Sequence, residues 1–197
     1  MSSAQWESIV LFGPPGSGKG TVGAFLAVSG AALHISSGDI FRGLSPHSPL
    51  GKLFHENANA GMLAPDEAAI QVWAGYINGL IATNRFFPER QWLLLDGVPR
   101  TLPQAKLLEA HVHIKKIIVL DIKDRNTLLK RLQRRSGLEG RADDANTEVL
   151  QRRLDIYDAQ TAAVLSHYPV SLVTHINGEQ KPLQVARDVL IALADLI

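Results

Sequence analysis

The sequence contains no cysteine, and this absence excludes disulfide bonds and metal sites built from thiolates. The first ten residues carry neither a basic segment nor a long apolar one, so they do not resemble a secretory signal. No apolar run is long enough to span a bilayer. The lack of cysteine is also compatible with a reducing compartment. We therefore expect a cytoplasmic protein.

The chain has almost no excess charge, because 20 Lys and Arg stand against 19 Asp and Glu. A net charge of +1 gives no overall signal for a polyanionic partner such as nucleic acid. Basic residues nevertheless gather between Lys123 and Arg153, and this local cluster suggests an anionic ligand. Apolar residues make up 46% of the 197 residues. That fraction is enough for one compact domain over residues 1–197.

Short apolar segments alternate with helical patterns along the chain. Strands are predicted at 8–12, 32–35, 92–95, 116–120 and 170–174. Helices are predicted at about 19–28, 50–60, 66–82, 102–110, 124–135, 146–167 and 182–196. The later strands are continuous apolar runs, which are typical of parallel strands covered on both faces. The order predicts an α/β domain with a doubly wound parallel sheet.

A glycine-rich segment, LFGPPGSGKGT at 11–21, joins the first predicted strand to the first predicted helix. Its glycines permit a tight turn whose backbone N–H groups converge on one anion, and the helix N-terminus adds further donors. Lys19 can reach the outer phosphates of a nucleotide. The segment matches the P-loop pattern, except that Gly20 occupies the usual Ser/Thr position and Thr21 follows it. The alternative is an ordinary glycine-rich turn with a surface lysine.

Two further motifs follow the second and third predicted strands, HISSGDIFR at 34–42 and LDGVPRTLPQA at 95–105. Carboxyl ends of parallel strands meet at one edge, so Arg42 and Arg100 should lie near the P-loop and could bind a second phosphate. Asp96 ends its strand there and could hold Mg²⁺, directly or through water. The alternative is that Asp96 caps a turn and both arginines pair with surface acids.

The basic cluster contains KRLQRR at 130–135, GRADD at 140–144 and RRL at 152–154. Arg131 and Arg135 share a helix face, where like charges repel unless an anion lies between them. Residues 136–140, SGLEG, are predicted as a short connection that could fold Arg141 toward Arg153. The alternative is a solvated basic helix. The seven histidines show no metal-ligand spacing, and we expect them in surface or packing roles.

These motifs follow one another over nearly the whole chain: GPPGSGKGT, HISSGDIFR, LLLDGVPRTLPQA, KRLQRR…GRADD and RRLDIY. In this order and spacing the chain resembles the adenylate kinase family of nucleoside monophosphate kinases. The resemblance implies a P-loop NTPase fold with a five-stranded parallel sheet. It also implies a helical NMP-binding insert at about 37–66 and a short lid at about 135–142. The implied reaction is reversible, Mg²⁺-dependent transfer, ATP + AMP = 2 ADP, by a monomer.

The resemblance also implies roles for individual residues. The expected catalytic residues are Lys19, Arg42, Arg100, Arg135, Arg141 and Arg153. The expected ATP-binding residues are Gly13, Pro14, Gly16, Ser17, Gly18, Lys19, Gly20, Thr21, Arg131, Arg135 and Gln180. The expected AMP-binding residues are Ser37, Arg42, Leu63, Ala64, Gly97, Arg100, Gln104, Arg141 and Arg153. Asp96 would hold Mg²⁺ through water, and Asp143 and Asp144 would steady the lid.

The sequence departs from the family pattern at Val98, where Phe is usual, and at Ser37, where adenylate kinases usually have Thr. By the same resemblance, Gln104 is expected to favour AMP over a pyrimidine acceptor, because the pyrimidine-specific relatives usually carry Asn nearby. Three alternatives remain at this point: a kinase for CMP or UMP, a nucleotide-binding regulator or RNA-binding protein that uses the basic cluster without turnover, and a P-loop hydrolase. No catalytic base is expected, because the attacking phosphate oxygen is largely ionised near neutral pH.

Overall fold

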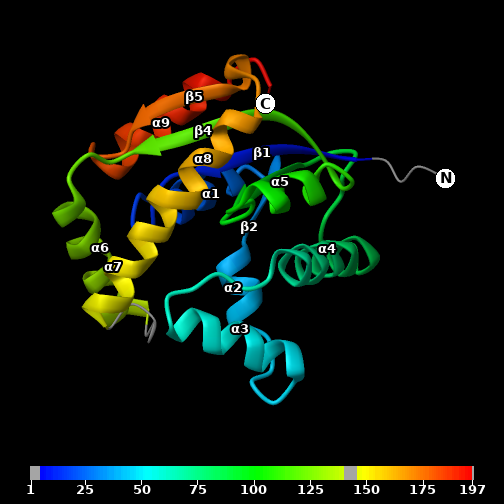
Figure 1. The fold of residues 1–197 in the computed structure, drawn as a ribbon. Helices are drawn as coiled ribbons and strands as arrows, with labels where there is room; N and C mark the ends of the chain where they lie inside the picture. Colours follow the sequence, from blue (N-terminus) through cyan, green and yellow to red (C-terminus); the bar gives the residue numbers. More distant parts are fainter. Residues whose placement is uncertain (1–4, 140–145, 197) are drawn as a thin grey trace.

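A five-stranded sheet forms the centre of the computed structural model, which describes residues 5–139 and 146–196 (Figure 1). The strands are β1 (Trp6–Phe12), β2 (Ala32–Ser36), β3 (Trp92–Asp96), β4 (Val112–Asp121) and β5 (Val173–Asn177). They lie in the order β2-β3-β1-β4-β5, and every neighbouring pair is parallel. The predicted α/β fold with a five-stranded parallel sheet is confirmed.

Helices cover both faces of this sheet (Figure 1). One apolar cluster joins Ile9 and Leu94 to α1 (Lys19–Ala27) and α9 (Pro182–Leu193). The other joins Val10 and Leu95 to α4 (Asp66–Ala82), α5 (Leu102–Leu108) and α8 (Ala162–Val164). Because successive strand side chains point to opposite faces, both layers can be filled only by uninterrupted apolar runs. This requirement explains the continuous hydrophobic strands of the sequence.

Two short helices between β2 and α4 project away from the sheet (Figure 1). They are α2 (Ser37–Arg42) and α3 (Pro49–Asn59). The Ser48 hydroxyl accepts a hydrogen bond from Gly51 N at 3.0 Å and caps α3. The rings of Phe41 and Phe54 stack with centroids 4.3 Å apart and join the two helices. The sequence analysis predicted α3 but not α2, because SSGD is typical of a turn and the helix has only six residues.

The basic helix α6 (Arg125–Glu139) is longer than predicted. The predicted connection at 136–140 is wrong for residues 136–139, because these residues continue the helix. A glycine at position 137 weakens a helix by only about 1 kcal/mol, and α6 is anchored by the buried Leu128 and Leu132. Gly140, Arg141, Asp143 and Asp144 lie outside the described residues.

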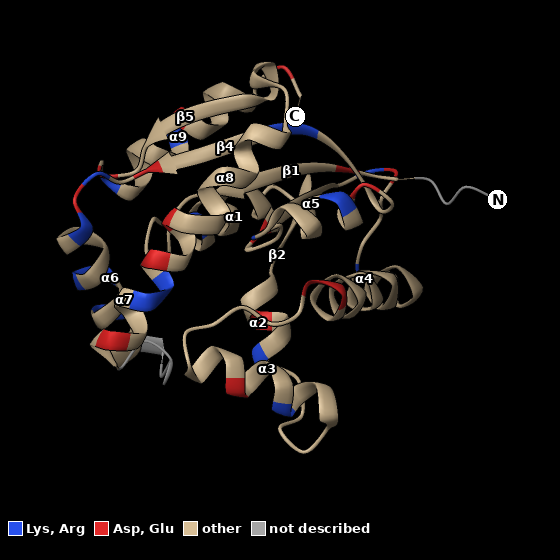
Figure 2. Ribbon diagram, viewed as in Figure 1, with Lys and Arg blue, Asp and Glu red and all other residues tan. Residues whose placement is uncertain are grey.

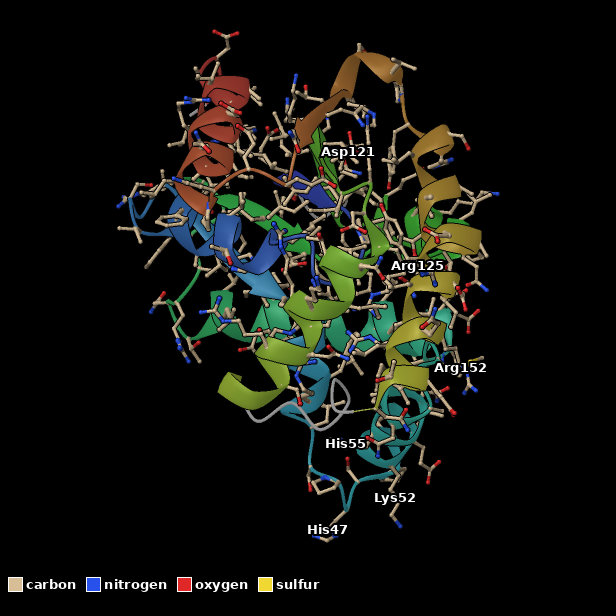
Figure 3. All side chains as sticks on the ribbon, turned by 90° about the vertical axis from the view of Figure 1, so that its left-hand side faces the viewer. His47, Lys52, His55, Asp121, Arg125 and Arg152 are labelled. Carbon is tan, nitrogen blue, oxygen red and sulfur yellow. The ribbon has the colours of Figure 1, made fainter. Side chains whose placement is uncertain are left out.

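The helix predicted at 146–167 is divided. It consists of α7 (Thr147–Ile156), a π-helical turn (Tyr157–Thr161), α8 and a 3₁₀ turn (Leu165–His167). Arg125, at the start of α6, lies beside this long helix and donates to Asp158 Oδ2 at 3.0 Å (Figure 3). This contact holds α6 against the π-helical turn.

The last strand begins later than predicted. Residues Val170–Leu172 form a 3₁₀ turn, closed by a hydrogen bond from Leu172 N to Pro169 O at 3.0 Å, and β5 starts at Val173. In the described ranges 5–139 and 146–196, no helix has both the length and the apolar character that crossing a membrane requires.

Candidate active site

A cleft of about 870 Å³ opens at the carboxyl ends of the central strands. Its walls come from the glycine-rich turn after β1, from α2 and α3, and from α6 and α7. Open parallel α/β sheets bind their ligands at this edge, because loops from neighbouring strands diverge there. The cleft is therefore the candidate active site.

Most of the predicted site residues line this single cleft. Those that do are Gly13, Gly16, Ser17, Gly18, Lys19, Gly20, Thr21, Arg42, Leu63, Ala64, Asp96, Gly97, Arg100, Gln104, Arg131, Arg135, Arg153 and Gln180. Pro14 and Ser37 are not among the lining residues. Arg141 lies outside the described residues.

The glycine-rich turn has a backbone that other residues would not adopt easily. Gly13, Gly16 and Gly18 have φ angles of 143°, 85° and 102°, in the region that favours glycine. A Cβ at Gly13 would also lie 2.6 Å from Ser17 Oγ and 2.8 Å from Leu120 O. Gly18 is the N-cap residue of α1, which begins at Lys19, and both residues line the cleft. The N-terminus of a helix is favourable for binding an anion.

Lys19 folds back over this turn. Its Nζ donates to Gly13 O at 2.7 Å and to Pro14 O at 3.0 Å. Burial lowers the pKa of Lys19 to about 8; Asp96 opposes this shift, whereas Arg100, Arg135 and Arg153 reinforce it. A lysine surrounded by three arginines marks a region of strongly positive potential. Such a region favours a ligand with several negative charges.

Asp96 ends β3 inside the cleft and is only 6% exposed. His34 Nε2 lies 3.3 Å from Asp96 Oδ2. Burial raises the pKa of Asp96, but the His34 hydrogen bond and the charge of Lys19 outweigh burial, so the net pKa is lowered. The carboxylate is therefore ionised at neutral pH.

His34 was missed by the sequence analysis, which assigned all histidines to surface or packing roles. Its ring lies against α1 at Gly23, where a Cβ would be 2.2 Å from the ring carbon Cδ2. The register explains the contact with Asp96, because Ser36 pairs with Asp96 and His34 shares the face of Ser36. The sequence indicates which residues of β2 share a face, but it does not indicate which strand lies beside β2.

Arg42 and Arg100 both line the cleft with Lys19. Arg42 forms an ion pair with the exposed Asp39 on its own helix, so the pairing with a surface acid that we considered also occurs. Arg100 Nε donates to Gly97 O at 2.7 Å. Gly97 has a φ of 82° and lets the Arg100 guanidinium approach the backbone closely. A Cβ added at this position would lie only 3.0 Å from that guanidinium.

Gln104, on α5, is 2% exposed and contacts the backbone of Arg100. Its Oε1 accepts a hydrogen bond from Arg100 N at 2.8 Å. The remaining polar group of this side chain is an NH₂, which can only donate.

Ser37 is fully buried, and its Oγ has no hydrogen-bond partner among the described residues. Val98, at the position that departs from the family pattern, is buried in the core.

The opposite wall is basic, and Figure 2 shows Lys and Arg gathered along α6 and beside α7. Arg131 Nη1 donates to Gly178 O at 3.1 Å, and Arg153 enters the cleft from α7. Arg134 also lines the cleft, although the sequence analysis did not select it. Gln180 holds its own loop, because its Nε2 donates to Asn177 O and to Asp188 Oδ2.

The residues present suit a metal held mainly by a nucleotide. Within the described ranges, no group of three or more His, Cys, Asp or Glu could hold a metal ion by itself. Mg²⁺ commonly keeps several waters and binds through one or two carboxylates together with substrate phosphates. The ionised Asp96, beside the glycine-rich turn, fits that pattern.

Comparisons with known proteins agree with this geometry. The model of the family described as "Adenylate kinase" matches residues 11–172. An adenylate kinase of Synechococcus is 34% identical over 194 residues, which covers 95% of each chain. An adenylate kinase of Micrococcus luteus is 37% identical and covers 86% of this chain and 82% of its own. One from Parabacteroides distasonis is 34% identical, with coverage of 82% and 83%. These matches, together with the parallel sheet and its P-loop, show that the chain belongs to the adenylate kinase family.

Proposed function

We propose that the cleft holds two nucleotides end to end, with ATP phosphates on the glycine-rich turn and the AMP phosphate against Arg42 and Arg100. The chain is a nucleoside monophosphate kinase of the adenylate kinase family, which interconverts ATP + AMP and 2 ADP. The observation that carries the proposal for the residues is that both arginines line the same cleft as Lys19. Lys19 and the two arginines are two groups of positive charge in one cleft, and each group can bind the phosphates of one nucleotide.

The chemistry requires alignment and charge neutralisation more than proton transfer. The acceptor phosphate oxygen is largely ionised at neutral pH, so no side chain needs to act as a base. Charge spreads over the equatorial oxygens of the transferred group, and fixed cations stabilise that charge. In this proposal Lys19, Arg135 and Arg153 surround the transferred group, while Arg42 and Arg100 orient the attacking phosphate.

Asp96 would hold Mg²⁺ through water, and when bound Mg²⁺ would neutralise charge on the phosphates of ATP. Thr21 also lines the cleft, and it supplies the hydroxyl that Gly20 lacks. His34 keeps the Asp96 carboxylate oriented through their contact. The family generally uses Mg-ATP, and the residue assignment is our proposal.

We further propose that residues 37–66 form an acceptor-binding insert. We also propose that residues 135–142, of which 135–139 end α6 and 140–142 lie outside the described residues, act as a short lid in a monomer. Closure of such pieces would exclude water and thereby prevent hydrolysis of ATP. The insert contributes Arg42 from α2 and the backbone near Leu63 and Ala64 to the cleft. Arginines on movable pieces would complete the site only when both nucleotides are present.

The fixed orientation of Gln104 supports AMP as acceptor. With its Oε1 engaged by Arg100 N, Gln104 offers an NH₂ donor to the base. Adenine N1 and cytosine N3 can accept that hydrogen bond, whereas guanine N1 and uracil N3 carry hydrogens and cannot. A buried polar group left unpaired discriminates strongly between ligands. Gln104 therefore places GMP and UMP last, and the similarity to adenylate kinases leads us to rank AMP ahead of CMP.

A panel of four acceptors tests this ranking. ADP formation from ATP is measured with AMP, CMP, GMP or UMP, and we expect kcat/KM for GMP and UMP to lie at least about 100-fold below that for AMP. Equal or faster transfer to UMP would contradict the assignment of Gln104. Nucleotide binding without ADP formation would indicate a regulator, and phosphate release without any acceptor would indicate a hydrolase.

The lowered pKa of Lys19 predicts a pH dependence of ATP binding. Lys19 carries its charge below about pH 8 and loses it as the pH rises. Since the charged form binds phosphate, the Kd for ATP measured without acceptor should rise above pH 8, toward about ten-fold per pH unit. Calorimetric titration from pH 6.5 to 9.5 measures this profile. A Kd that stays constant across pH 8 would exclude Lys19 as the titrating contact.

A further inference from the structure

A threonine to which no role has yet been assigned contacts the backbone of Arg100. Thr161 ends the π-helical turn between α7 and α8 and is 7% exposed. Its Oγ1 donates to Arg100 O at 3.0 Å, across 61 residues of sequence. Thr161 also lines the cleft. This buried hydroxyl therefore holds the backbone of the residue whose side chain we propose binds phosphate.

Arg100 is held on both sides of its Cα. Its N–H donates to Gln104 Oε1 at 2.8 Å, and its C=O accepts from Thr161. Its side chain is held near the backbone by the Nε contact with Gly97 O. With both neighbouring peptide groups fixed, the direction in which the Arg100 side chain leaves the backbone is also fixed.

The element that carries Thr161 is itself fastened. The π-helical turn is closed by Ala162 N donating to Tyr157 O, and Asp158 within the turn accepts from Arg125 of α6. Turns of this kind occur frequently at functional sites. Arg153 lies on the α7 portion of the same helical stretch. One helix therefore presents Arg153 to the cleft and holds the backbone of Arg100.

We propose that Thr161 is a positioning residue, whose hydroxyl orients Arg100 toward the acceptor phosphate and aligns it with Arg153. The inference rests on the proposed function, because Arg100 must be the acceptor-binding arginine. Thr161 does not touch a nucleotide in this scheme and acts only through the Arg100 backbone. Its effect should therefore appear in reaction with AMP and not in binding of ATP.

The test compares Thr161→Val, which keeps the shape and removes the hydroxyl, with Thr161→Ser, which keeps the hydroxyl. We expect the Val variant to raise KM for AMP about five-fold and to lower kcat about ten-fold, with KM for ATP changed less than about two-fold. The Ser variant should restore wild-type values. Thr83→Val is the matched control, since Thr83 Oγ1 donates to Gly79 O at the far end of α4, and its kinetics should be unchanged.

A double-mutant cycle shows whether Thr161 acts through Arg100. In an Arg100→Ala background, Thr161→Val should change kcat/KM for AMP by less than about two-fold, because no guanidinium remains to be oriented. The proposal would be overturned if Thr161→Val lowered kcat/KM for AMP by the same factor in the Arg100→Ala background as in the wild-type protein. A Val variant that loses thermal stability but keeps wild-type KM for AMP would also overturn it. If the Val variant does not fold, Thr161→Ala compared with Thr161→Ser is judged by the same criteria.

Failure of this inference and failure of the proposed function give different results. A wild-type protein that forms no AMP-dependent ADP would overturn the proposed function. An active wild-type protein whose Thr161→Val variant has unchanged AMP kinetics would overturn only the role of Thr161.

Discussion

Replacing Arg100 with alanine should lower kcat/KM for AMP by about 1,000-fold, or about 4 kcal/mol of transition-state stabilisation. In the proposed complex this guanidinium binds the attacking phosphate, so its loss removes both affinity and alignment. ATP contacts other groups, and its Kd measured without acceptor should change little. Coupled measurement of ADP formation, together with calorimetric binding of ATP and of AMP, separates the two effects.

Arg90→Ala serves as the control for loss of an arginine. Arg90 is exposed in the connection between α4 and β3 and is not among the residues that line the cleft. Its replacement should leave kinetics and stability unchanged, because substitutions at exposed positions away from a site usually change little. The proposed role fails if Arg100→Ala folds and turns over AMP at the wild-type rate.

Lys19→Met should lower kcat by about 1,000-fold while the fold survives. The side chain of methionine fills similar space but supplies no charge to the phosphates of ATP. Lys106→Met, at an exposed position of α5, is the matched control and should be fully active. Turnover at the wild-type rate in a folded Lys19→Met variant would refute the assignment of Lys19.

Stability should respond to Lys19→Met in the opposite direction from activity. Burial lowers the pKa of Lys19 to about 8 from its ordinary value of 10.5. A folded state with a lowered lysine pKa holds its proton less tightly than the unfolded chain. The charged lysine therefore destabilises the fold fully below about pH 8, and this penalty disappears as the pH rises through 10.5. Methionine removes the penalty, so thermal unfolding at pH 7 should occur at the same or a higher temperature.

Several features of the protein were determined by local sequence. Continuous apolar strands alternating with helices gave the parallel α/β fold, because period and length of apolar runs reflect burial directly. The P-loop could be predicted because positive φ angles demand glycine at Gly13, Gly16 and Gly18. Arg42, Asp96 and Arg100 could be selected because each ends or closely follows a strand whose carboxyl end meets the cleft.

Only the tertiary structure decided which distant groups meet. The placement of β2 beside β3 brings His34 to Asp96, and the return of the helix after α7 brings Thr161 to Arg100. The length of α6 also depends on packing, because Leu128 and Leu132 anchor it in the core and residues 136–139 extend it. Local sequence specifies backbone conformation and burial period, whereas pairing across 61 or 62 residues depends on strand order and helix packing, which local sequence does not encode.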